Sequence, residues 1–244
     1  MNPILEMAKD RLRGKVIAVM SAKGGVGKSI IASLIALNLS EKQRAALIDL
    51  DIYGNSILKL FGIQELHRVS KDGIEPFIIG NLSIYTVGGL IGDRYVVLPG
   101  GYEGGVIESL LGLANIRERL IVIDTPPGMG EELLTLMKIV SPEIILVTLP
   151  SKLSVKIVKH MLDFLLESRL KPKLIVVNMA FLESPNGPIY PFGKLDYVYE
   201  VEKEYGVKVE FLPIDPDIER FIGRIHEYLG QLRKSLKSLE LVLL

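Results

Sequence analysis

The chain has 244 residues, 48% of them hydrophobic, and its 29 basic residues balance its 29 acidic ones. Because Lys and Arg are not in excess, the composition argues against a protein that binds nucleic acid mainly by neutralising phosphates. The lack of cysteine excludes disulfides, thiolate nucleophiles, and zinc or iron–sulfur sites held by the chain's own thiolates. No apolar run reaches the roughly 18 residues of a membrane span, and acidic residues interrupt the first segment, so we expect a cytoplasmic protein.

Short apolar runs rich in β-branched residues alternate with longer segments of helical period. The runs predict strands at 15–20, 45–50, 82–87, 120–123, 144–148, 174–177 and 207–212. The longer segments predict helices at 28–39, 105–113, 131–140, 151–170, 194–205 and 216–239. This alternation predicts an α/β fold, a single doubly wound and mainly parallel sheet flanked by helices, over residues 14–244. Ligands are then expected at the carboxyl ends of the strands.

Both ends of the chain carry amphipathic patterns. Residues 1–13 place their apolar side chains on one face, which predicts a short helical arm that folds back on the domain or docks a partner. Residues 229–239 set leucines against basic residues and run into an apolar end at 241–244. Such a tail suits a helix packed on the domain or on another protein, and less often one lying on a membrane surface.

A glycine-rich segment links the first strand to the first helix. It reads Ser21-Ala22-Lys23-Gly24-Gly25-Val26-Gly27-Lys28-Ser29. Such a turn lets backbone N–H groups converge on phosphate oxygens at the N-terminus of a helix. In this arrangement Lys28 reaches the β and γ phosphates and the Ser29 hydroxyl binds Mg²⁺. We expect the nucleotide to be bound by Gly24, Gly25, Val26, Gly27, Lys28, Ser29 and Ile30.

Acidic residues follow two of the predicted strands. The second strand ends in Asp49-Leu50-Asp51, and the fourth runs into Asp124-Thr125-Pro126-Pro127-Gly128. A carboxylate after the second strand is placed to hold a metal-bound water while its neighbour orients the water that attacks the γ-phosphate. Asp124 occupies the position of a Walker B carboxylate. Together with the glycine-rich loop, these residues predict a site that binds ATP and Mg²⁺ and hydrolyses ATP.

These motifs resemble those of a known family. Residues 23–29 look like the deviant Walker A motif of the Mrp/MinD ATPases, and residues 49–56 and 124–130 resemble the Mrp branch. The likeness extends over residues 14–225 and implies a P-loop NTPase fold and a homodimer in the ATP state. It implies that Lys23 reaches the partner's phosphates, that Asp51 positions the attacking water, and that Asp49 and Asp124 hold Mg²⁺ through water.

The resemblance includes the residues expected to contact the adenine base, but it does not include the cysteines that bind an iron–sulfur cluster. It implies that Asn178 reads adenine and that Pro213 and Asp215 flank the same base. Mrp-type iron–sulfur carriers have a Cys-Pro-x-Cys motif where this chain reads Ser184-Pro185-Asn186-Gly187. Both thiolates are missing, so cluster carriage in the usual manner is excluded.

Three functions are compatible with an Mrp-like ATPase that has no cysteine. The preferred hypothesis is an accessory factor for metallocentre assembly, resembling the archaeal nickel-insertion ATPase of [NiFe]-hydrogenase maturation and acting with a small zinc- and nickel-binding protein. A second is a MinD- or partition-type spatial organiser on membrane or DNA, although direct contact with nucleic acid or membrane is not expected here. A third is an iron–sulfur cluster carrier with nonstandard ligands.

Overall fold

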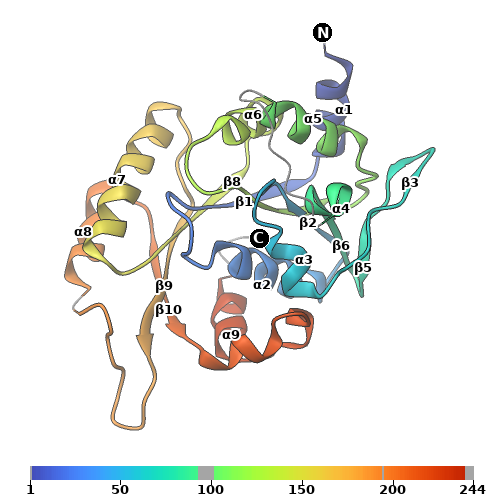
Figure 1. Cartoon of the computed structure of the whole chain (residues 1–244). Helices are drawn as coiled ribbons and strands as arrows, with labels where there is room; N and C mark the ends of the chain where they lie inside the picture. The colour runs from blue at the N-terminus through green and yellow to red at the C-terminus, as the bar shows by residue number, and fades with distance from the viewer. Residues whose placement is uncertain (1, 93–101, 194, 240–244) are drawn as a thin grey trace.

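Parallel strands form the centre of the molecule. The computed structural model describes residues 2–92, 102–193 and 195–239, and within them the main sheet has eight strands in the order β10-β9-β8-β1-β7-β2-β6-β5 (Figure 1). All neighbouring pairs are parallel except β5 and β6. The strands are β1 (Lys15–Met20), β2 (Ala45–Asp49), β5 (Phe77–Ile79), β6 (Leu82–Thr86), β7 (Leu120–Asp124), β8 (Glu143–Thr148), β9 (Leu174–Leu182) and β10 (Val209–Ile214).

Helices cover both faces of this sheet. Successive residues of a strand point to opposite faces, so Ala18 and Met20 of β1 enter one core and Ile17 and Val19 the other. The first core is covered by α1 (Pro3–Arg11), α5 (Glu103–Leu113), α6 (Glu131–Ile139), α7 (Lys152–Glu167) and α8 (Asp196–Tyr205). The second is covered by α2 (Lys28–Ser40), α3 (Ser56–Phe61) and α9 (Gln231–Ser238). The predicted doubly wound α/β fold is therefore confirmed.

Several elements differ from the sequence prediction. The single helix expected at 216–239 is wrong: the chain forms two 3₁₀ turns, Pro216–Phe221 and Ile225–Glu227, before α9 begins. Gly223, at a φ of +90°, turns the backbone between the two segments, a conformation that a continuous α-helix does not contain. The structure also adds α4 (Gly88–Ile91) and a small hairpin of β3 (Val69–Ser70) and β4 (Gly73–Ile74). These elements are too short to give a periodic signal.

The N-terminal arm folds back on the domain as α1. Asn2 caps the helix by accepting a hydrogen bond from the Ile4 amide at 3.1 Å, and its amide group donates to Glu108 of α5 at 2.8 Å. Ala8 is buried against α5 and α6. Close packing on α5 requires Gly112, because a Cβ there would lie 2.7 Å from the Ile4 carbonyl oxygen.

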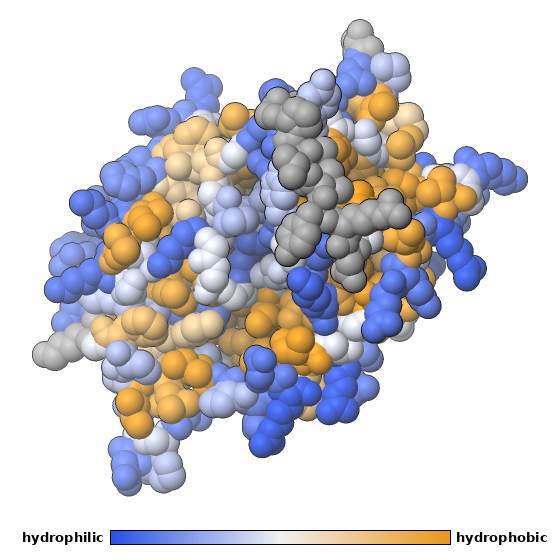
Figure 2. Space-filling model, in the orientation of Figure 1, coloured by the Kyte–Doolittle hydropathy of each residue, from blue (hydrophilic) through white to orange (hydrophobic). Residues whose placement is uncertain are grey.

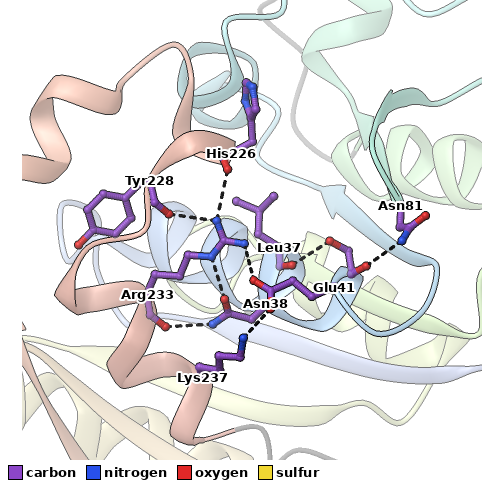
Figure 3. Close-up of polar contacts among 9 residues, drawn as sticks. Leu37, Asn38, Glu41, Asn81, His226, Tyr228, Arg233 and Lys237 are labelled. Carbon is purple, nitrogen blue, oxygen red and sulfur yellow. Dashed lines mark hydrogen bonds and ion pairs between the residues drawn. The ribbon is translucent and has the colours of Figure 1, made fainter.

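The C-terminal helix α9 is fastened to α2 by a buried guanidinium (Figure 3). Arg233 donates to the Asn38 side chain at 2.9 Å, to Glu41 at 3.0 Å and to the Tyr228 carbonyl at 3.0 Å, while Asn38 donates back to the Arg233 carbonyl. Leucines of the same helix are buried in the second core. The apolar face of α9 is thus occupied by its own domain. No helix in the described residues is both long and apolar enough to span a bilayer.

Candidate active site

The glycine-rich segment lies between β1 and α2 and lines a cavity of about 450 Å³. Gly25 and Gly27 have φ values of +78° and +85°, the left-handed region that glycine enters without strain. A Cβ on Gly24 or Gly25 would meet no atom within 4 Å, so these glycines face open space. The loop therefore presents its backbone to the cavity directly ahead of the positive end of the α2 dipole, the arrangement that binds phosphate.

Most predicted nucleotide contacts are brought together here. The cavity is lined by all seven residues from Gly24 to Ile30, and by Asp51 and Pro127 from the loops after β2 and β7. It is also lined by Ser56, the last residue of the motif at 49–56, and by residues that no sequence motif indicated, Met179 of β9 and Lys59 and Leu60 of α3. Beyond Ser56, nothing in the sequence of α3 marks it as part of the site, because its approach depends on how the chain turns after β2.

Two carboxylates lie side by side beneath the loop. Asp49 and Asp124 are fully buried and are register partners at the carboxyl ends of β2 and β7. Lys28 is nearly buried, and its Nζ lies 2.5 Å from Asp124 Oδ1. Burial raises the pKa of Asp49 to about 8, and the charge of Asp124 adds to this effect. Burial also raises the pKa of Asp124, while Lys28 opposes that rise.

This donor set fits a magnesium ion. Asp124 Oδ2 is buried and has no hydrogen-bond partner among the described residues. One lysine faces two buried carboxylates, so ionising both leaves negative charge that a cation would neutralise. Carboxylate and hydroxyl oxygens, the latter from Ser29 at the start of α2, are the ligands that Mg²⁺ prefers.

Asp51 and Lys23 lie at the rim of the site. The Asp51 side chain accepts hydrogen bonds from the amides of Tyr53 at 3.2 Å and Gly54 at 2.9 Å, which fixes its loop, and it still lines the cavity. Lys23 is half-buried and does not line the cavity within one chain. Its predicted target belongs to a second copy.

The residues predicted to contact adenine are placed differently from one another. Asn178 is buried and donates a hydrogen bond to the Val26 carbonyl at 2.9 Å, so it stabilises the backbone of the P-loop. Pro213 pairs with β9, and the Asp215 carboxylate accepts hydrogen bonds from Tyr228 and from the Gln231 and Asp217 amides. None of the three lines the cavity, and their contact with the base stays a prediction.

Comparison with known proteins identifies the family of this chain. A profile described as "ParA: NUBPL iron-transfer P-loop NTPase" matches residues 13–238. The chain belongs to this family. It is therefore a P-loop NTPase of the Mrp/MinD type, a family consistent with ATP and Mg²⁺ as ligands, which confirms the resemblance found in the sequence.

Relatives and a solved structure agree with this assignment. The chain is 32% identical over 209 residues to the iron–sulfur cluster carrier protein of Rickettsia felis, covering 84% of this chain and 63% of that protein. It is 32% identical over 219 residues to the iron–sulfur cluster carrier protein of Saccharolobus solfataricus, covering 83% and 72%. The nucleotide-binding protein of Archaeoglobus fulgidus, solved in complex with ADP, is 29% identical with a TM-score of 0.79, covering 94% and 95%.

Proposed function

We propose that this ATPase acts in iron–sulfur cluster assembly as an ATP-driven accessory factor, with the cluster held by a partner protein. The names of the relatives support the choice of metal, and they favour iron–sulfur chemistry over the nickel insertion preferred by the sequence analysis. The partner is required because the chain has no cysteine. In addition, no group of three or more His, Asp or Glu side chains within the described residues is placed to hold a metal.

The need for a partner that holds the cluster is supported most directly by the turn at 184–187. The sequence resemblance places the cysteines of Mrp carriers at this turn. The Ser184 hydroxyl donates to the Gly187 carbonyl at 2.6 Å, and the Gly187 amide donates to the Ser184 carbonyl at 3.0 Å. Leu182 and Ile189 close the hairpin with a pair of backbone hydrogen bonds at 2.8 Å. The turn is therefore closed by its own hydrogen bonds and offers iron no thiolate.

The chain's own residues supply the steps of ATP hydrolysis. The P-loop amides and Lys28 hold the phosphates, so Lys28 exchanges Asp124 for a phosphate oxygen when nucleotide enters. Ser29 would hold Mg²⁺ directly, and Asp49 and Asp124 through water. The bound ion supplies positive charge against the phosphates. Asp51 orients the attacking water from the rim of the cavity.

ATP binding is proposed to close a homodimer through Lys23, and hydrolysis to reopen it. Asn178, Pro213 and Asp215 are proposed to surround the base, with Asn178 linking base recognition to the P-loop that it supports. The arm α1 uses one face to pack on α5, and its exposed face is available to the small metal-binding partner. Lys23→Ala should therefore bind ATP as a monomer, which light scattering will report.

Affinity capture tests the choice of partner. The Asp51→Asn protein, which should hold ATP without turnover, is used as bait in lysate of the source organism with ATP and again with ADP. We expect an iron–sulfur scaffold or acceptor to be retained with ATP only. Recovery of a hydrogenase subunit instead would restore the nickel hypothesis. If the purified chain alone binds a cluster on anaerobic incubation with iron and sulfide, the partner requirement is wrong.

The spatial-organiser hypothesis finds less support. Of the leucines that made this tail a candidate membrane contact, Leu232, Leu236 and Leu239 are buried in the second core and Leu229 is exposed, while the apolar end at 241–244 lies outside the described residues. On the face shown in Figure 2, apolar side chains form separate patches divided by hydrophilic ones. Sedimentation of the ATP-bound protein with anionic vesicles would revive this alternative.

A further inference from the structure

Thr86 lies at the carboxyl end of β6, beside the two site carboxylates. It is fully buried and is the register partner of Asp49 on the neighbouring strand β2. The Thr86 hydroxyl donates to Asp49 Oδ2 at 3.2 Å and accepts a hydrogen bond from the Gly88 amide at 3.1 Å. The Gly88 amide thus occupies an acceptor position of the hydroxyl and leaves its proton directed at the carboxylate.

The other oxygen of Asp49 is held by the loop that carries Asp51. Asp49 Oδ1 accepts a hydrogen bond from the Asp51 amide at 3.0 Å. Thr86 and the Asp51 backbone therefore hold opposite oxygens of one carboxylate and fix its rotation about the side-chain axis. Any rotation of this carboxylate would displace the Asp51 backbone, and with it the side chain at the rim of the cavity.

His67 holds Thr86 from the opposite side. Its Nε2 accepts a hydrogen bond from the Thr86 amide at 3.1 Å, and its Nδ1 lies 2.8 Å from the Glu75 carbonyl oxygen. An amide only donates and a carbonyl only accepts, so both contacts require the neutral tautomer protonated at Nδ1. The ring stacks on Phe77 with centroids 4.2 Å apart. Gly89 permits this approach, because a Cβ there would lie 2.5 Å from the ring.

We propose that Thr86, held in place by His67, is a positioning residue for ATP hydrolysis. Its hydroxyl sets the orientation of Asp49, and Asp49 in turn sets the position of Asp51. This rests on the roles proposed above for Asp49 and Asp51. Because Thr86 does not line the cavity, removal of its hydroxyl should impair turnover and leave nucleotide binding intact.

Thr86→Val tests the proposal, since valine keeps the shape and lacks the hydroxyl. We expect kcat to fall about tenfold, the scale of one hydrogen bond to a charged group, with KM for ATP within about twofold of wild type. Thr86→Ser restores a hydroxyl and should regain most of the lost kcat. Binding of a fluorescent ATP analogue checks that affinity is unchanged in both variants.

Ser83→Ala provides a matched structural control on the same strand. Ser83 is buried and donates to Glu118 at 2.6 Å, a hydroxyl–carboxylate hydrogen bond outside the nucleotide cavity. Both variants should melt at lower temperature, and only Thr86→Val should lose kcat. A Thr86→Val enzyme with wild-type kcat overturns the proposal, as does an equal loss of kcat in Ser83→Ala. If Asp51→Asn keeps full turnover, the role of Asp51 fails instead, which separates the two hypotheses.

Discussion

Replacing Lys28 by Met should alter the stability of this protein as well as its nucleotide binding. Lys28 Nζ is 2.5 Å from Asp124 Oδ1, and Asp124 and its neighbour Asp49 are both fully buried. Methionine has a similar length and no charge, so the variant keeps two buried carboxylates without their cation. Nucleotide binding should be lost, because the P-loop then has no side chain to reach the phosphates.

The size of the stability loss follows from proton linkage. Breaking a buried ion pair by removing one partner costs about 3–5 kcal/mol, unless the remaining group takes up a proton. Without Lys28, burial raises the pKa of Asp124 further, because the largest opposing contribution is gone. A raised acid pKa gives stability that is complete below the unfolded value and is lost as pH rises through the folded value. Stability in this window falls by at most about 1.4 kcal/mol per pH unit, so the variant should lose more stability relative to wild type at about pH 7.5 than at about pH 5.5.

Urea unfolding at these two pH values measures the effect, with titration of a fluorescent ATP analogue run in parallel. The double variant Lys28→Met with Asp124→Asn should regain stability at the higher pH without regaining nucleotide binding, because the uncompensated charge is gone and the phosphate ligand is still missing. Lys59→Met is the control, since Lys59 lines the same cavity and is exposed. A stability loss in Lys28→Met that does not change with pH would refute the reasoning.

Three further outcomes are expected. Asp51→Asn should retain its affinity for ATP, because the phosphate-binding loop is unchanged, and should release phosphate about a hundredfold more slowly, because the attacking water is no longer positioned. Wild-type turnover would contradict this role. Burial raises the pKa of Asp49 to about 8, so Mg-ATP should displace a proton near neutral pH and bind more tightly as pH rises toward that value. Calorimetry in two buffers of different ionisation enthalpy measures the release, and Asp49→Asn should lose it. Arg233→Met should lower the free energy of unfolding by about 2–4 kcal/mol, because Asn38 Oδ1 and the Tyr228 carbonyl lose the donor that they share. The exposed Lys234→Met should have little effect in urea unfolding.

The parallel core of the fold was predictable from local pattern. Seven strands of the sheet were expected near their observed positions, because buried parallel strands are continuous apolar runs between helical segments. The edge strand β5 was missed because its three residues are half-exposed and carry no distinct period. The prediction of a single helix at 216–239 was wrong for a different reason. Leu232 and Leu236 keep a helical spacing, and the turn at Gly223 interrupts only the segment before them.

The sequence by itself determined the chemistry of the site. A glycine-rich turn before a helix and acidic residues after two strands suffice to predict an Mg-ATP site, since each group acts through the local backbone conformation of its own motif. Only the tertiary structure decided how these groups are held. The links from His67 to Thr86 and from Thr86 to Asp49 join segments far apart in the chain, so no spacing reveals them. The same holds for the support that Asn178 gives to Val26 across 152 positions, because contacts between distant segments exist only after the sheet has assembled.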